Sequence, residues 1–310
     1  MKYLFLLFLL LTFKLTYGQD GSLTDNQMTN DEREKMIIYE LQDFRYNFFK
    51  GDTLRYSVAS FDSIIINYGK PLEKTRFEQI EVTCDSVSKD RKFLLGFRLL
   101  KLISDESFDK EENVRRLTSP WVGRKTYLWI DSLGNRVKSY PDDTLKLAIS
   151  PGGAFAPYLF FPIQETYRYI NESWIVNSND TIYENGVPAS VLKQSSLFRA
   201  RKPIDTLGYE SSRFSFIKTA IGAVNVITPE QILRTEATIS GSGFMTMSKK
   251  EHFPVHYFAN IEQKLMIFYP EQDALPGQHY ISTDWTLDTF IPSKLRYAPE
   301  NGSKSKKKKK

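Results

Sequence analysis

The 310-residue sequence has a single cysteine, Cys84, so no disulfide can form within the chain. A fold without such bridges depends on a large buried core. Cys84 ends the run Ile80-Glu-Val-Thr-Cys84, in which strand alternation places it on the same face as Ile80 and Val82. We expect Cys84 to be a buried packing residue, because no basic group that would activate its thiol can be identified nearby.

Histidine is also scarce, with His252, His256 and His279 as its three representatives. His252 and His256 are four residues apart, a spacing that binds a metal ion on a helix. The surrounding residues alternate as in a β-strand, however, and two extended residues at this spacing lie about 13 Å apart, too far to share one ion. The sequence therefore predicts no metal site and no cofactor.

Motifs of the common enzyme classes are missing. Gly241-Ser-Gly243 is too short for a Gly-x-Ser-x-Gly nucleophile elbow. Neither a phosphate-binding loop nor a dinucleotide fingerprint is present. Carboxylates are plentiful, but no pair is distinguished as an acid and a base. We predict a protein that is not an enzyme, and keep an undetected hydrolase as the least favoured interpretation.

The sequence has one long apolar run, from Tyr3 to Phe13, which follows Lys2 and is broken by Lys14. It is roughly half the length of about 20 residues that a membrane-spanning helix needs. Small residues three and one positions before Gln19 fit a signal-peptidase site, so residues 1–18 predict a signal peptide. No cysteine lies at the cut to accept a lipid. We expect an exported protein, periplasmic or extracellular, that is soluble after cleavage before Gln19.

Positive charge is concentrated at the C-terminus. The formal net charge is +5, but without the signal and the final lysines the remaining body has slightly more acidic than basic residues. This balance disfavours nucleic acid as a partner. The tail is expected either to be a solvated end or to bind an anionic membrane surface, where each lysine contributes about 1 kcal/mol. The lysines expected to make that contact are Lys306, Lys307, Lys308, Lys309 and Lys310.

Aromatic residues are abundant, with 22 Phe and 17 Tyr, and many alternate with polar residues as in two-faced strands. Residues 44–48 and 54–58 both alternate in this way around a turn at Gly51-Asp52, which predicts a hairpin. The pattern predicts a mostly β fold, a curved antiparallel sheet or open half-barrel with one or two short helices crossing a face. Further strands are predicted at 64–66, 80–84, 93–99, 125–130, 173–176, 181–183, 213–217, 233–239, 244–247, 255–261 and 265–269.

These features divide the chain into four parts. Residues 1–18 are the signal peptide, and residues 19–42 are a polar leader with a short helix predicted at 31–41. Residues 43–295 form a single β-rich domain. Residues 296–310 are a disordered basic tail.

The middle of the domain departs from the strand pattern. Residues 142–149 favour a short helix, and residues 151–162 contain three prolines and two glycines. The apolar side chains here are expected to be buried, either as a plug in the core or as a lid over a hydrophobic ligand. They are Phe155, Tyr158, Phe160 and Phe161.

Several hairpin segments resemble those of uncharacterised exported proteins of Bacteroidota, which are similar in layout to the lipoprotein-carrier (LolA/LolB-like) superfamily. The segments are Phe49 to Tyr56, Val82 to Phe93, Gly241 to Ser248 and Pro254 to Tyr257. The resemblance covers most of residues 44–269 through loose motifs. It implies an open half-barrel whose apolar concavity receives acyl chains, with residues 142–162 as the lid. It implies no active-site residues, and this chain is longer than a carrier.

The favoured interpretation is a non-enzymatic envelope protein that shelters a hydrophobic small molecule or lipid, such as an acyl chain. The alternative is a structural or protein-interaction module of the envelope, in which the inner face of the sheet is fully packed. The two differ in whether that inner face is hollow or filled.

Overall fold

The computed structural model describes residues 41–108, 112–141, 155, 158–164, 167–184, 187–227, 232–270 and 273–297. The chain divides into two units, Met1–Leu41 and Gln42–Lys310, and the second is described below. The predicted signal peptide lies outside the described residues, and so does the helix predicted at 31–41 except for its last residue, Leu41. The helix predicted at 142–149 and the lysine tail lie outside them as well.

The second unit is built on one antiparallel sheet of twelve strands, in the order β7-β6-β4-β3-β2-β14-β13-β12-β11-β10-β9, with β5 paired to β4. The short strands β1 and β8 form a separate pair. No helix among the described residues is long and apolar enough to span a bilayer. The elements are β1 (Leu41–Asp43), β2 (Thr53–Ile66), β3 (Leu72–Val87), β4 (Phe93–Phe108), β5 (Glu112–Arg116), β6 (Lys125–Ile130), β7 (Arg136–Pro141), β8 (Tyr167–Tyr169), β9 (Ser173–Glu184), β10 (Val187–Thr206), β11 (Tyr209–Ile227), β12 (Ile232–Ser248), β13 (Pro254–Phe268), β14 (Leu275–Ile291) and the 3-10 helix η1 (Lys294–Tyr297).

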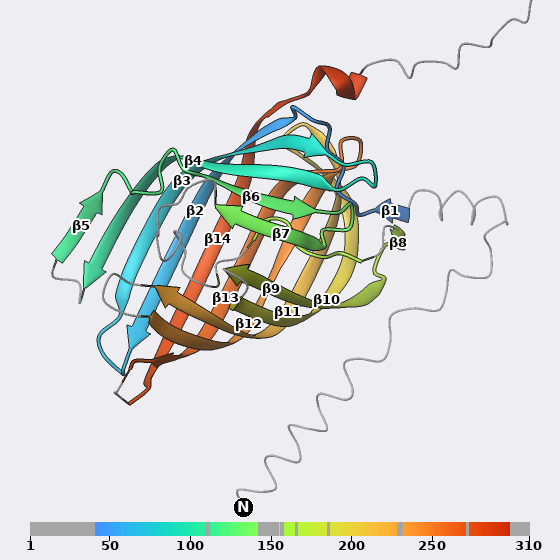
Figure 1. Ribbon diagram of the computed structural model, residues 1–310. Coiled ribbons are helices and arrows are strands. Elements are labelled where there is room, and N and C mark those ends of the chain that lie inside the picture. The colour runs from blue at the N-terminus through green and yellow to red at the C-terminus, as the bar shows by residue number, and fades with distance from the viewer. Residues whose placement is uncertain are drawn as a thin grey trace, which may run out of the picture. The chain divides into compact units, whose positions relative to one another are not determined.

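The strand order explains how the sheet curls (Figure 1). The chain enters in the middle at β2 and proceeds outward to the edge strand β7. It then crosses to the opposite edge, β9, and returns hairpin by hairpin to β14, which pairs with β2. Arg136 on β7 and Asp180 on β9 form an ion pair of 2.9 Å, so the two edges meet. The predicted mostly β fold with a curved antiparallel sheet is confirmed, and the sheet closes further than an open half-barrel.

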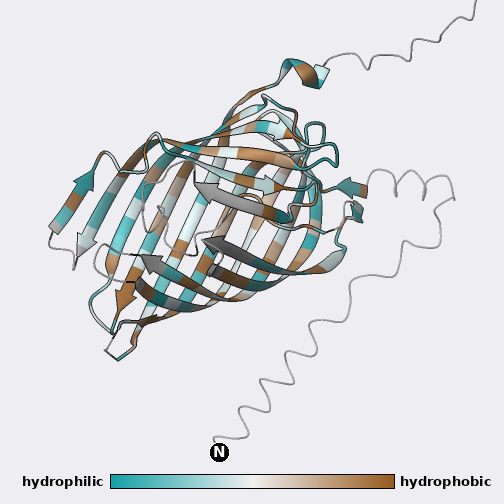
Figure 2. Cartoon of the chain, in the orientation of Figure 1, coloured by the Kyte–Doolittle hydropathy of each residue, from teal (hydrophilic) through white to brown (hydrophobic). Residues whose placement is uncertain are grey.

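One face of the sheet forms the core. Along β2, Leu54, Tyr56 and Val58 are buried, while Arg55 and Ser57 between them are not. Figure 2 shows this alternation as bands of opposite hydropathy along the strands. Where the sequence predicts two short strands, one long strand is often present, because polar outward-facing residues interrupt the apolar pattern without ending the strand. Residues 233–239 and 244–247, for example, both belong to β12.

The glycines between those two predicted segments serve close packing within β12. A Cβ on Gly243 would collide with the carbonyl oxygen of Phe258 on the adjacent strand β13, and would lie 2.7 Å from the ring of Phe216. Gly241-Ser-Gly243 is thus a strand segment in which backbone and ring approach closely, not a turn.

Residues 44–48 form no strand, so the first arm of the predicted hairpin is wrong. The alternation does predict burial correctly, because Phe44, Tyr46 and Phe48 are all in the core. Phe44 stacks on Trp174 of β9 at 5.7 Å, whereas Phe48 meets Phe93 of β4 at 5.5 Å. The segment therefore runs inside the barrel between distant strands. Its backbone donates to loop carbonyls, such as that of Ser132, instead of a β-ladder.

The end of the domain extends beyond the predicted boundary at residue 295. Arg296 and Tyr297, assigned from sequence to the basic tail, lie in η1. The guanidinium of Arg296 forms an ion pair of 2.6 Å with the fully buried carboxylate of Asp52. This pair holds η1 against the turn that precedes β2, because separating it would leave Asp52 buried without a counter-charge.

Cys84 is buried, as predicted, with 1% of its surface exposed. Burial, together with the nearby carboxylates of Asp52 and Asp85, raises the pKa of its thiol to about 12. The thiolate is therefore scarce at neutral pH, which fits a packing residue.

Candidate functional site

A cavity of about 290 Å³ lies at the seam where β7 and β9 meet. We call it the seam pocket. The turn before β7, the strands β9 to β13 and the segment that crosses from β7 to β9 all contribute to its wall. Its lining residues are Gly134, Asn135, Arg136, Phe155, Tyr158, Phe160, Phe161, Pro162, Asn177, Ser178, Asn179, Asp180, Leu192, Gln194, Ser196, Phe198, Phe216, Lys218, Ala220, Ile239 and Tyr257.

One side of the seam pocket is aromatic. The ring of Phe161 stacks on Phe198 with centroids 6.0 Å apart, and lies 5.6 Å from Phe216 and 5.9 Å from Tyr257. Phe198 and Phe216 face inward because they occupy the buried positions of β10 and β11. An apolar surface of this kind suits the hydrocarbon part of a ligand.

All four residues predicted as a lid or plug line the seam pocket. None of the described residues of their segment is helical. Phe160 is 3% exposed and packs edge-on against Tyr46, whereas Tyr158 is 45% exposed. Phe155 is buried, and its carbonyl accepts a hydrogen bond from Gln263. The segment thus contributes both to the core and to the wall of a cavity. The sequence predicted these two roles, a core plug and a lid over a ligand, as alternatives.

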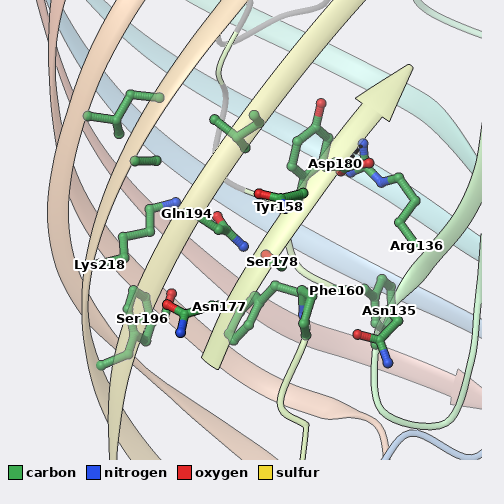
Figure 3. Close-up of a pocket in the computed structure, with 18 of the residues that line it drawn as sticks. Asn135, Arg136, Tyr158, Phe160, Asn177, Ser178, Asp180, Gln194, Ser196 and Lys218 are labelled. Carbon is green, nitrogen blue, oxygen red and sulfur yellow. Dashed lines mark ion pairs between the residues drawn. The ribbon is translucent and has the colours of Figure 1, made fainter. Parts of the chain in front are cut away.

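Side chains close the seam at the mouth of the pocket. No ladder joins β7 to β9 among the described residues, and Arg136 bridges them through its ion pair with Asp180 (Figure 3). The same guanidinium lies over the ring of Tyr158, 4.4 Å from the centroid. Burial raises the pKa of Asp180, and Arg136 partly opposes that rise. The closure is thus made by side chains that can move without breaking strand pairing.

Lys218 is the unusual member of the lining. It lies on β11 between the inward-facing residues Phe216 and Ala220, and its side chain is half-buried. It forms no ion pair or hydrogen bond with any described residue, and burial lowers the pKa of its ammonium to about 8. The other charged lining residues, Arg136 and Asp180, neutralise each other. The described lining therefore has a net charge of +1, located at Lys218.

Uncharged polar groups surround this lysine. Ser196 is its direct partner on β10, and Gln194 lies opposite Ala220 in the same register. Figure 3 shows Gln194, Ser196 and Lys218 projecting into the pocket from neighbouring strands. The side chains of Gln194 and Ser196 have no hydrogen-bond partner among the residues that the structure describes. The pocket thus combines an aromatic wall with unused donors on β10 and β11.

A second polar cluster on the inner face of the sheet is, by contrast, fully paired. Arg76 on β3 forms ion pairs with Asp62 at 2.7 Å and Glu78 at 3.1 Å. His279 on β14 lies 3.0 Å from the other oxygen of Asp62. These four side chains satisfy one another in the interior, so we assign them a structural role.

The other two histidines have separate carboxylate partners. His252 lies in a turn with a φ of 60°, not in the extended conformation predicted from sequence, and its Nε2 is 3.9 Å from Asp43. His256 lies in β13 and is 2.9 Å from Asp284. Within the described ranges, no group of three or more potential ligands could hold a metal ion.

Sequence reasoning missed the charged residues of the seam pocket. Lys218 had a detectable signal, because extending the alternation of Phe214 and Phe216 by one step places it on the same inward face. The predicted strand ended one residue too early, at 217. Arg136 and Asp180 had no such signal, since their contact depends on the closure of the whole sheet.

No protein-family model matches the chain, and no curated protein matches it. Among solved structures, lipovitellin, described for its lipid–protein interactions, is 10% identical with a TM-score of 0.40, over 80% of this chain and 26% of lipovitellin. This chain therefore spans about a quarter of that protein. OmpF of Salmonella typhi, in complex with daunomycin, is 9% identical with a TM-score of 0.21, over 76% of this chain and 98% of OmpF. Likenesses this distant assign no function, and the residues of the seam pocket carry the functional interpretation.

Proposed function

We propose that this chain is a non-enzymatic binding protein that holds a small ligand with an elongated apolar body in the seam pocket. The observation that carries the proposal is the cavity itself, which combines an aromatic wall with polar groups that have no described partner. Its volume lies at the lower end of the range of about 300–1,000 Å³ typical of ligand pockets. A single short chain fits such a space better than a bulky lipid.

The proposal keeps the acyl-chain ligand that the resemblance to lipoprotein carriers implies. It places that chain in a pocket at the seam between β7 and β9 instead of an open concavity. The ionisable groups of the lining also favour binding over hydrolysis. The one described carboxylate of the lining, Asp180, is paired with Arg136 and is therefore not free to act as a general acid or base. We further propose export, supported by residues 1–18, and contact with anionic membrane surfaces through Lys306 to Lys310.

Filling the pocket tests the proposal. The variant Gln194→Trp is expected to weaken binding of octan-1-ol at least about tenfold, because the indole occupies space that the chain needs. Isothermal titration calorimetry measures the affinity. Octan-1-ol is chosen because it is uncharged, so its binding does not depend on an ion pair.

The matched control is Ser195→Trp, one residue further along β10, where the side chain is exposed on the outer face. It should bind octan-1-ol as the unmodified protein does, and circular dichroism should show that both variants are folded. If the unmodified protein takes up neither octan-1-ol nor decan-1-ol, or if Gln194→Trp binds them equally well, the proposal is wrong.

A further inference from the structure

We infer that the ligand of the seam pocket carries a carboxylate at one end, and that Lys218 binds this group. The inference rests on the proposed function and specifies the chemical class of the ligand as a short- or medium-chain fatty acid. It follows from the charge of the pocket, from the position of Lys218 between polar and aromatic neighbours, and from the contrast with Arg76, a buried cation elsewhere on the inner face that is paired with two carboxylates.

The charged groups of the described lining do not balance, because they include two cations and one carboxylate. A partly buried ammonium without a counter-charge is unfavourable, since it gives up part of its hydration without an electrostatic partner. Arg76, the cation buried elsewhere on the inner face, has two carboxylates within 3.1 Å. Lys218 has none among the described residues, because the carboxylate of Asp180 is paired with Arg136. A carboxylate on the ligand supplies the missing partner.

The neighbours of Lys218 suit a carboxylate. On the adjacent strand, Ser196 lies directly opposite the lysine and Gln194 lies two residues further along, opposite Ala220. A carboxylate has two oxygens and accepts several hydrogen bonds, so it can use the ammonium together with one of these donors. On the same inward face of β10 and β11, Phe198 and Phe216 begin the aromatic wall that would hold the hydrocarbon chain.

The protonation of Lys218 gives the inference a pH signature. The ammonium is the form that binds, and its pKa in the free pocket is lowered by burial to about 8. A bound carboxylate favours the charged amine, so this pKa rises in the complex. Affinity is therefore expected to be constant well below pH 8 and to fall above it. Binding near pH 8 should take up protons.

Calorimetry with octanoate and octan-1-ol, two ligands of equal chain length, separates the head from the chain. The unmodified protein is expected to bind octanoate roughly 10- to 100-fold more tightly at pH 7, the factor typical of a hydrogen bond to a charged group. Lys218→Met should abolish this preference, so that octanoate and octan-1-ol bind the variant with similar affinity. Lys193→Met, at an exposed position on β10, should change neither affinity.

The stability of the variant provides a second readout. Lys218→Met removes a half-buried charge that has no counter-charge among the described residues, so the variant should unfold at a temperature no lower than that of the unmodified protein. Titrations of octanoate at pH 8 in two buffers of different ionisation enthalpy measure the proton uptake. Equal affinity for octanoate and octan-1-ol, or a preference for octanoate that persists in Lys218→Met, overturns the carboxylate inference and leaves the proposed function standing. Failure of both ligands to bind overturns the proposed function, and this inference with it.

Discussion

Replacing Arg76 by Met is expected to lower the free energy of unfolding by about 3–5 kcal/mol at pH 7, the cost of removing one partner from a buried ion pair. The guanidinium lies between Asp62 and Glu78, and its side chain is 4% exposed. Without it, two carboxylates share the interior, and the described contact that remains is that of His279 with Asp62. Denaturation in urea at fixed pH measures the change.

The loss should depend on pH. In the intact protein, burial raises the pKa of Glu78, and Arg76 opposes that rise. Burial also acts to raise the pKa of Asp62, but hydrogen bonds from His279 and Arg76 outweigh it and the pKa is lowered. Without Arg76, both pKa values rise above those of the unfolded chain. A carboxyl group with a raised folded pKa destabilises the protein as pH rises through that value, so the deficit should shrink between pH 7 and pH 4.

Arg55 provides the matched control, because it lies on β2 and pairs with Glu81 on β3 at 3.0 Å, but on the outer face. Its side chain is 50% exposed, and Arg55→Met should cost less than about 1 kcal/mol. Equal losses for the two variants, or a deficit of Arg76→Met that grows toward pH 4, would contradict the assignment of Arg76 to a buried structural cluster.

Phe160→Ala is expected to cost about 3–5 kcal/mol, as large-to-small substitutions of aromatic residues in a core do. Its ring packs edge-on against Tyr46, Phe48 and Phe97, with centroids 5.3–5.7 Å apart. Tyr46 and Phe48 belong to the segment 44–48 inside the barrel, and Phe97 belongs to β4. The variant therefore loses contacts that join separate parts of the barrel. The free energy of unfolding at neutral pH tests this.

Tyr158 serves as the control within the same segment. It is 45% exposed, and its main described contact is with the guanidinium of Arg136 at the mouth of the pocket. Tyr158→Ala should therefore change stability by less than about 1 kcal/mol. If the two substitutions had equal effects, residues 158–161 would act as a detachable cover and not as part of the core.

The class of fold could be predicted from residue alternation alone. Phe44, Tyr46 and Phe48 show the limit of that reasoning: alternation predicts which side chains are buried, but a segment inside the barrel alternates as a strand does. Whether such a segment joins a ladder depends on its backbone partners, which lie far away in sequence. Closure was similarly unpredictable, because the ion pair between Arg136 and Asp180 joins residues 44 positions apart at opposite sheet edges.

The candidate site was predictable in part. Phe155, Tyr158, Phe160 and Phe161 stand out in a segment rich in proline and glycine, and all four line the seam pocket. Lys218 follows from the strand period once β11 is given its full length. The sequence could not indicate that this lysine has no counter-charge among the described residues, because that depends on Asp180 being paired across the seam.

The crystal structure of the protein with 8-bromooctanoate bound would test most directly whether the seam pocket holds an apolar chain, since anomalous scattering locates the bromine independently of the protein. We predict a bromine peak inside the pocket, against the wall formed by Phe161, Phe198 and Phe216. Bromine found only elsewhere on the molecule, with the pocket free of ligand density, would contradict the proposed function.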